Sequence, residues 1–555
     1  MNIQHSALAA RRGEQLAIVA VWAAAIAFIN PRGNFPIDDD WDFALATWRY
    51  AETGHFHFTA FTAASLRAQV LWGALWTRLF GESFDVLRLS TLVLGAATLV
   101  VVYRMLRRAD VPRFGCVVAV LALGFHPIFL WSSCTFMTEV PFLFASAVAL
   151  ACFIRGFDDD RVAWVLAGCA AAMTACFVRQ TGITLLAAPM LLAMVRRRWR
   201  DAAVIGGTIA LFGAIYLVNP EWLTGSPAEF AVHFRMWTES TFRLPEQIAV
   251  FDHYATFNAQ NCALFFLPLV VPLALVFVDN RRRIDFVIAA LLAVVLFVRV
   301  QSLVAAGLPM PYFVSPYCCD VFAGNIFADF GLGPLALPGL FPFRLPYAAR
   351  LAITYGSVLL AVCLLWAVLR RAATTNASIL ALGAALFGSL ALFGSGLYVD
   401  RYSLDSAWPL VIALPLMLPW QSRTVRGAAL PRSSSLPRSR RSRYRSTSRG
   451  IAPAGRRSTI CGRTASPSRR STPARSRFTF TSCRKAINGC DGYTSSVFLT
   501  ARTRWLSSHS PASASLRAIP IAAGSVCTGA RSLCSSHAGS LRCRSDEAGG
   551  AALGN

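Results

Sequence analysis

Long apolar segments separated by short basic stretches dominate residues 1–420 of the 555-residue chain. A helix needs roughly 20 mostly apolar residues to cross the hydrocarbon core of a bilayer. The pattern predicts twelve spans, of which the fifth, sixth and twelfth are short. They are residues 14–30, 84–106, 114–132, 139–155, 161–178, 182–195, 201–218, 259–278, 284–304, 348–369, 375–397 and 407–420. The predicted fold is an all-α polytopic membrane protein with further helices in its outer loops.

Clusters of arginine mark the loops that we expect on the cytoplasmic side, where Arg and Lys are enriched. If the N-terminus is cytoplasmic and there are twelve spans, all of these clusters fall on that side. They are Arg11-Arg12, Arg107-Arg108 with Arg113, Arg155 with Arg161, Arg196 to Arg200, Arg281 to Arg283, and Arg370-Arg371. We therefore predict a multi-pass protein of a bacterial inner membrane with both termini in the cytoplasm.

The first predicted outer loop, residues 31–83, contains a helical pattern of its own. Between Leu66 and Phe80, Leu and Trp recur at the spacing of one helix face, and Arg67, Gln69 and Arg78 supply a polar face. Such a helix can lie in the headgroup plane of the membrane. An ordinary loop helix packed against the rest of the protein explains the pattern equally well.

The same loop carries the run Asp38-Asp39-Asp40-Trp41-Asp42. Crowded carboxylates raise one another's pKa, and a raised pKa suits one of them to act as a general base. The alternative is a solvated acidic loop. Other ionisable or polar groups are expected on the same face, and they are Glu139, Arg179, Gln180, Asp400, Arg401 and Tyr402. Charges at the membrane are costly enough to indicate a functional site.

Composition separates this membrane region from the rest of the chain. Hydrophobic residues make up 55% and charged residues 15%, too few charges to cover several soluble domains. The net charge of +25 divides unevenly: residues 1–420 hold 29 Arg against 25 acids, a net +4, and residues 421–555 hold 24 basic residues against 3 acids, a net +21. The basicity is thus no evidence of nucleic-acid binding, and no Cys/His spacing indicates a metal site.

Five motifs, in order along the predicted outer side, resemble those of the C-type glycosyltransferases that use polyprenyl-phosphate sugars. That superfamily includes protein O-mannosyltransferases, aminoarabinose transferases of lipid A and RgtA/B/C/D-like bacterial proteins. The motifs are Asp39-Asp40-Trp41-Asp42-Phe43-Ala44, Phe80-Gly81-Glu82-Ser83-Phe84 with Leu87-Arg88-Leu89-Ser90, Thr135-Phe136-Met137-Thr138-Glu139, Val178-Arg179-Gln180-Thr181-Gly182, and Asp400-Arg401-Tyr402. Glu139 stands where the family usually has Asp.

The resemblance implies sugar transfer at the outer membrane face, from a polyprenyl-phosphate donor to a hydroxyl of a lipid, glycan or protein, with inversion. By analogy Asp39 is the general base, Asp40 is the next candidate, and Glu139 orients the acceptor or a cation. Arg179 and Arg401 would bind the donor phosphate. Supporting positions are Asp38, Trp41, Asp42, Gln180, Asp400 and Tyr402. No cofactor or metal is implied, although a carboxylate-rich site can hold a divalent cation.

A secondary transporter or a polysaccharide flippase is the alternative function. Transporters often have internal repeats and charges near the membrane midplane. The two halves of this chain show no convincing repeat, and most charges are in loops, with Arg88 and Arg299 as the main exceptions.

Residues 421–555 are rich in Ser and Arg, with 27 Ser among 135 positions, and have no amphipathic period. This composition predicts disorder. We interpret the segment as a GC-rich gene read out of frame after about Pro419, in preference to an RNA-binding arm. Resequencing past codon 420 is expected to reveal a frame change, and an intact frame with the same tail in close relatives would refute it.

Overall fold

A computed structural model describes residues 2–37, 39–59, 62, 64–223, 244–279, 282–305, 309–310, 346–371, 375–394 and 400–420. All of them belong to one compact unit, Met1–Arg441. Within these ranges the secondary structure is helical and contains no strand, which confirms the predicted all-α class. Asp38 and the segment 421–555 lie outside the described residues.

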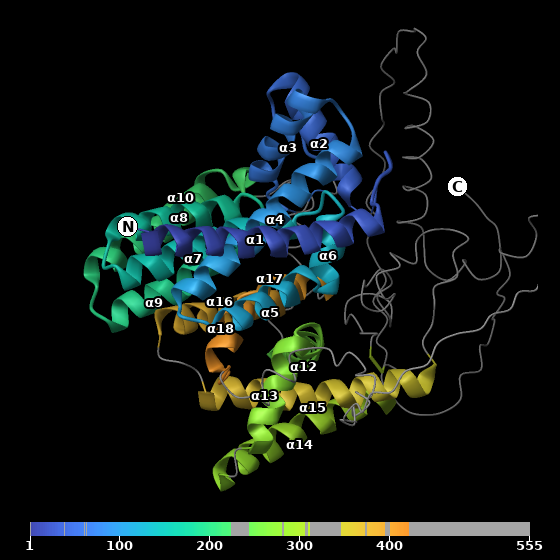
Figure 1. The fold of residues 1–555 in the computed structure, drawn as a ribbon. Coiled ribbons are helices and arrows are strands. Elements are labelled where there is room, and N and C mark those ends of the chain that lie inside the picture. The colour runs from blue at the N-terminus through green and yellow to red at the C-terminus, as the bar shows by residue number, and fades with distance from the viewer. Residues whose placement is uncertain are drawn as a thin grey trace, which may run out of the picture. The chain divides into compact units, whose positions relative to one another are not determined.

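The first half of the unit contains the helices between the N-terminus and Trp222, just after the seventh predicted span (Figure 1). They are α1 (Asn2–Ile29), α2 (Asp40–Thr53), α3 (Arg67–Phe80), α4 (Phe84–Arg108), α5 (Arg113–Gly124), α6 (Pro127–Ser133), α7 (Glu139–Asp158), α8 (Val162–Cys176), η1 (Gln180–Leu186), α9 (Ala187–Val195), α10 (Trp199–Val218) and η2 (Pro220–Trp222).

The second half continues with helices that include the last five predicted spans. They are α12 (Leu244–Phe265), α13 (Leu267–Asp279), α14 (Arg283–Ala305), α15 (Tyr347–Arg371), α16 (Asn376–Gly394), α17 (Asp400–Ala407) and α18 (Leu410–Met417). Every predicted apolar segment therefore coincides with a helix or with two consecutive helices.

Seven of the described helices are long and apolar enough to cross a membrane, or up to nine if each of two bent helix pairs counts as one span. The pair α5 and α6 bends by 62°, and the pair α12 and α13 bends by 96°. The segments Val162–Cys176 and Gln180–Val195 are apolar but shorter. Several spans in one chain fit a multi-pass membrane protein, and the number twelve stays a prediction.

Helix α7 forms the centre of the packing in the first half. It contacts α4, α8, α16 and α17. The helix is buried on most sides, and its buried residues include the small side chains of Ala145, Ser146, Ala147 and Ala149. Small residues let neighbouring helix backbones approach closely, as helix packing in membranes requires. The N-terminus of this helix, Glu139, is therefore fixed between several neighbours.

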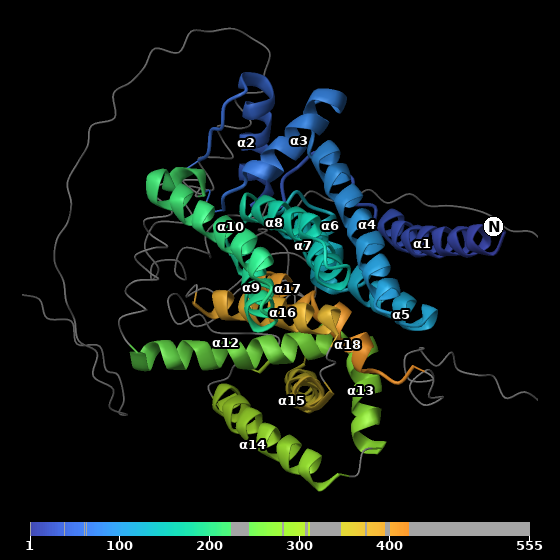
Figure 2. The same ribbon diagram turned by 90° about the vertical axis from the view of Figure 1, so that its left-hand side faces the viewer.

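Helix α3 agrees within one residue with the helix that the sequence predicts at Leu66–Phe80. Figure 2 shows it beside α2, at the N-terminal end of α4. Its small and polar residues pack inward, whereas Leu71, Leu75 and Leu79 are exposed by 48%, 50% and 65%. An ordinary packed loop helix would bury these leucines. The exposed apolar row favours the alternative, a helix that lies in the headgroup plane.

An ion-pair network joins several basic clusters at the opposite end of α4 and α7. Arg108 pairs with Asp158 and Asp159, and Arg155 also pairs with Asp159. Arg198 pairs with Asp160 and Asp201. The clusters that follow α4, α7 and α9 thus gather at one end of these helices, as expected for loops on one side of a membrane. Which side is cytoplasmic stays a prediction.

Arg88, near the start of α4, fixes the beginning of the first outer loop. Its buried guanidinium donates hydrogen bonds to the carbonyl oxygens of Gly33 and Phe35. It also lies over the ring of Phe35, 5.0 Å from the ring centroid. The stretch that leads to Asp39 is thereby tied to the helix bundle, so Arg88 acts at the loop and not as a midplane charge.

The substitution Arg88→Gln is expected to lower the free energy of unfolding and to loosen residues 31–37. Hydrogen bonds from charged groups contribute about 1.5–3 kcal/mol each, and two of them would be lost. The measurement is thermal unfolding of the detergent-solubilised protein, together with limited proteolysis of the loop. Arg104→Gln is the matched control, because Arg104 is exposed on the same helix. Equal unfolding temperatures for the two variants would contradict this role of Arg88.

Candidate functional site

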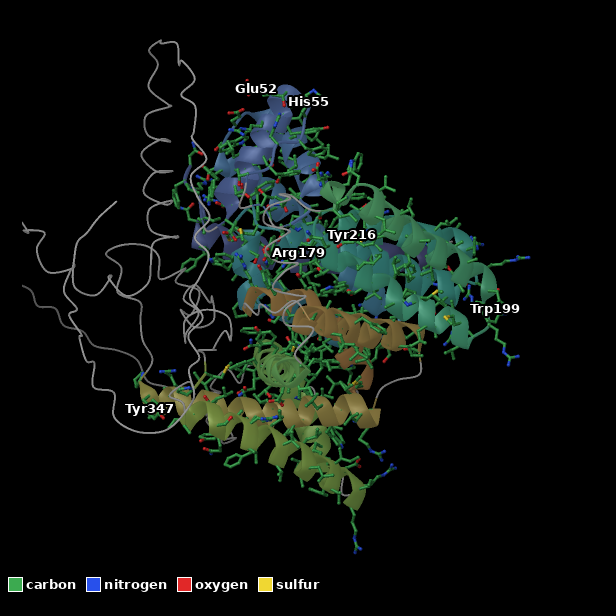
Figure 3. The ribbon with its side chains drawn as sticks, turned by 180° about the vertical axis from the view of Figure 1, so that it is seen from behind. Glu52, His55, Arg179, Trp199, Tyr216 and Tyr347 are labelled. Atoms are coloured by element: carbon green, nitrogen blue, oxygen red, sulfur yellow. The ribbon has the colours of Figure 1, made fainter. Side chains whose placement is uncertain are left out.

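Charged side chains from four separate segments meet at the end of the helices where α2 and α3 lie. Asp39 precedes α2, Glu139 begins α7, Arg179 occupies the turn between α8 and η1, and Arg401 and Asp405 belong to α17. In Figure 3 Arg179 lies beside the orange ribbon of α16 and α17. We call Asp39, Glu139, Arg179, Arg401, Tyr402 and Asp405 the charged cluster.

Arg179 is the central cation of the cluster, and its side chain is only 12% exposed. Its Nη1 atom is 3.2 Å from Glu139 Oε1 and 3.2 Å from Asp405 Oδ2. The guanidinium also lies over the Tyr402 ring, 4.5 Å from its centroid. Burial lowers the pKa of Arg179, but the charges of Asp405 and Glu139 outweigh burial, so the pKa lies above its ordinary value. Arg179 therefore stays a cation throughout the accessible pH range.

Arg401 connects the cluster to the acidic run of the first loop. Its Nη2 atom donates to Asp39 Oδ2 at 2.8 Å, and its Nε atom is 3.7 Å from Glu139 Oε1. Glu139, with 1% of its side chain exposed, thus faces both arginines. Asp39 is 51% exposed, so it combines an arginine partner with access to solvent.

Asp405 is the carboxylate that the sequence did not single out. It follows Arg401 by one helical turn, but the Asp-Arg-Tyr motif ends before it, and its partner Arg179 lies far away in the chain. Burial raises the pKa of Asp405 to about 7, and the neighbouring Arg179 offsets the burial only in part. Only the juxtaposition of α17 with the α8–η1 turn reveals this residue.

The turn that carries Arg179 is held on both sides. The amides of Leu66 and Ala68 donate to the carbonyls of Val178 and Phe177, at 3.2 and 3.0 Å. On the inner side, Gly182 lies so close to α8 that a Cβ atom there would be 2.5 Å from the backbone nitrogen of Cys176. The glycine of the Val-Arg-Gln-Thr-Gly motif thus permits the close approach that positions the arginine.

The other acids of the first loop have structural surroundings. Asp40 is fully buried, and its Oδ1 accepts a hydrogen bond from the Ile37 amide. Asp42 accepts hydrogen bonds from the hydroxyls of Thr59 and Thr62, both at 2.6 Å. Burial raises the pKa of Asp42, although the two hydroxyls lower it. The catalytic role predicted for Asp40 stays a prediction, as do the roles of the other candidate residues.

The remaining predicted residues lie around the cluster or outside the described part. Trp41 packs against the apolar cluster beneath α2, and Gln180 is the first residue of η1, next to Arg179. Tyr402 stacks under both arginines. Asp400 begins α17, its side chain is not among those described, and Asp38 is not described either.

The charged cluster has the groups for two kinds of chemistry. Asp39 is a reachable carboxylate, and two arginines can bind an anion such as a phosphate. Within the described ranges, no group of three or more His, Cys, Asp or Glu side chains is arranged to hold a metal ion.

Residues 71–223 match the sequence profile of a family described as dolichyl-phosphate-mannose-protein mannosyltransferase. The matched segment includes Glu139 and Arg179. The match confirms the resemblance to the polyprenyl-phosphate-dependent glycosyltransferase superfamily that the motifs indicate. Among curated protein sequences, none matches the chain.

Two solved structures are similar to this chain, both of ArnT from Cupriavidus metallidurans. The apo state has 16% identity and a TM-score of 0.34, and covers 73% of this chain and 77% of ArnT. The structure bound to undecaprenyl phosphate has 16% identity and a TM-score of 0.35, with 72% and 76% covered.

The substitution Gly182→Ala is expected to displace the α8–η1 turn and to destabilise the protein. The added methyl group meets backbone atoms of α8, which cannot rotate away, and such overpacking costs about 1–3 kcal/mol. Thermal unfolding and amide hydrogen exchange of residues 175–182 measure the effect. Gly207→Ala in α10 is the matched control, since a Cβ atom there meets nothing within 4 Å. Unchanged exchange in Gly182→Ala would contradict the close-approach argument.

Proposed function

We propose that this chain is a membrane glycosyltransferase that moves a sugar from a polyprenyl-phosphate donor to a hydroxyl group of a lipid, glycan or protein. The observation that carries the proposal is the charged cluster, in which a reachable carboxylate, Asp39, pairs with Arg401, and Glu139 faces both Arg401 and a second arginine, Arg179. The family match over residues 71–223 supports the reaction class. The cluster lies at the end of the helices that the arginine distribution predicts to face the outside.

Asp39 is the proposed general base. Its carboxylate takes the proton of the acceptor hydroxyl while that oxygen forms a bond to the anomeric carbon of the sugar. The bond between the anomeric carbon and the phosphate oxygen breaks on the opposite side, so the configuration inverts. The lipid phosphate leaves with the electron pair. The 51% exposure of Asp39 supports this role, because the base must reach a proton on the incoming acceptor.

Arg179 and Arg401 are the proposed phosphate-binding residues. The lipid phosphate is already an acidic leaving group, so it needs cationic stabilisation more than a proton. A single preorganised donor for developing negative charge contributes about 3–4 kcal/mol in other enzymes. Tyr402 lies against both guanidinium groups and Glu139 faces both, which supports preorganisation of the two cations.

Glu139 is the proposed orienting group. Its buried carboxylate faces both arginines through a single oxygen, Oε1. The Glu139 Oε2 atom is buried and has no hydrogen-bond partner among the described residues, so a substrate hydroxyl that reaches it would satisfy it. The length of Glu139, one methylene more than the usual Asp of the family, supports its reach to both arginines.

The substitution Asp39→Asn is expected to lower the rate of sugar transfer by about 10²–10⁴-fold, the usual contribution of a general base. The assay uses membranes that contain the full chain, a set of defined polyprenyl-phosphate sugars, and detection of the glycosylated product. Glu52→Gln is the matched control, because Glu52 is an exposed acid at the other end of α2 (Figure 3).

Two outcomes separate the alternatives. If the Asp39→Asn variant is expressed normally and transfers sugar at the same rate as the wild type, Asp39 is not the general base. The proposed glycosyltransferase function would still stand. Absence of transfer by the wild type with every donor would contradict the proposed function and favour a transporter or flippase.

A further inference from the structure

We propose that Asp405 is a positioning residue that serves as the counter-ion of Arg179 in the empty site and takes up a proton from solvent when a lipid phosphate binds to that arginine. The inference rests on the proposed function and adds to it how the site accommodates the charge of its donor. It predicts that donor binding and proton uptake are coupled.

The arrangement of charges leads to this inference. The charged cluster contains two arginines and three carboxylates, those of Asp39, Glu139 and Asp405. A phosphate that reaches Arg179 brings further negative charge into a largely buried group that already has an excess of one carboxylate. Neighbouring negative charges repel one another more strongly in a buried site than in water, because the dielectric constant is lower there. Loss of one negative charge, by protonation of a carboxylate, removes that conflict.

Among the three carboxylates of the charged cluster, Asp405 is the one whose ionised form is least stabilised by its neighbours. Asp39 is half exposed and accepts a 2.8 Å hydrogen bond from Arg401, and Glu139 faces two arginines through one oxygen. Asp405 pairs with Arg179 through Oδ2, and its buried Oδ1 has no hydrogen-bond partner among the described residues. Glu139 Oε2 is likewise unpaired, but Glu139 Oε1 faces both Arg179 and Arg401. A buried, unpaired carboxylate oxygen is costly when ionised, and much less so as the neutral acid.

The neighbours of α17 define the electrostatic surroundings of Asp405. The α8–η1 turn contributes Arg179, α7 contributes Glu139, and α17 itself contributes Arg401 and Tyr402. Helices α6 and α16 also pack against α17, and their sequences contain no ionisable side chain. From α12, the described acid Asp252 pairs with Arg299 at 2.9 Å. The side chains of Glu246 and His253 on α12 are outside the described set.

The direction of the pH dependence follows from the position of the titration. Because burial raises the pKa of Asp405 to about 7, the residue is mostly neutral at pH 6 and mostly ionised at pH 8. The ionised Asp405 carboxylate competes with the donor phosphate for Arg179. The donor should therefore bind more weakly as the pH rises through 7. If the donor binds only when Asp405 is neutral, its affinity decreases in proportion to the neutral fraction, by about tenfold between pH 6 and pH 8.

The test is binding of a polyprenyl phosphodiester of glucose to the full chain in nanodiscs at pH 6, 7 and 8. A phosphodiester keeps a constant charge over this range, so any pH dependence belongs to the protein. The wild type is expected to lose about tenfold in affinity from pH 6 to pH 8. Asp405→Asn, which mimics the neutral acid, is expected to bind at every pH with the affinity of the wild type at pH 6.

Asp405→Glu is the conservative variant, and it should retain a pH dependence because it retains a titrating carboxyl. A wild-type affinity that does not change with pH would overturn the role of Asp405, as would Asp405→Asn that keeps the wild-type slope. A merely structural role predicts lower affinity of Asp405→Asn by the same factor at each pH, which also overturns the proposal. Absence of binding by the wild type at every pH, with this donor and with the other polyprenyl-phosphate sugars of the transfer assay, contradicts the proposed function itself.

Discussion

The site depends on one cation that three separate segments share. Arg179, in the turn between α8 and η1, contacts Glu139 at the start of α7 and Asp405 in α17. Neither partner has more than 12% of its side chain exposed, so loss of Arg179 would be costly, because Asp405 would remain as a largely buried carboxylate without its ion-pair partner. The ion pairs therefore hold together the ends of helices that lie more than 200 residues apart in the chain, and they keep the guanidinium in one place.

The first outer loop uses its acids in two ways. Asp40 and Asp42 are buried and accept hydrogen bonds from the loop itself, which gives the turn into α2 a defined shape. Asp39 instead belongs to the charged cluster, where it pairs with Arg401. Consecutive residues around a helix N-terminus point in different directions, so a run of acids need not act as one group. One carboxylate is presented to the site because its neighbours fix the backbone.

Hydrophobic length and helical spacing were enough to predict the all-α class, the positions of the apolar segments and the helix α3, because these features are local. His126-Pro127, near the end of the third predicted span, indicates a kink, and the 62° bend between α5 and α6 lies there. The bend between α12 and α13 was not predicted, since that pair reads as one continuous apolar run. The motifs identified Asp39, Glu139, Arg179 and Arg401, which the structure brings together. Asp405 was missed because its importance comes from a neighbour far away in the chain, and no local pattern encodes that contact.

The exposed leucines of α3 bear on how deep in the membrane the charged cluster lies. On its inner side, Gly73 of the same helix lies against Phe136 and Leu87, so α3 packs directly on the segment that precedes α7 and on the start of α4. The interfacial interpretation of α3 predicts that its row of leucines lies in the acyl region, which would hold the segments packed against the helix near the level of the lipid phosphates. On the proposed function, a polyprenyl donor would then present its head group without leaving the bilayer, and its long tail would remain dissolved among the lipids throughout the reaction.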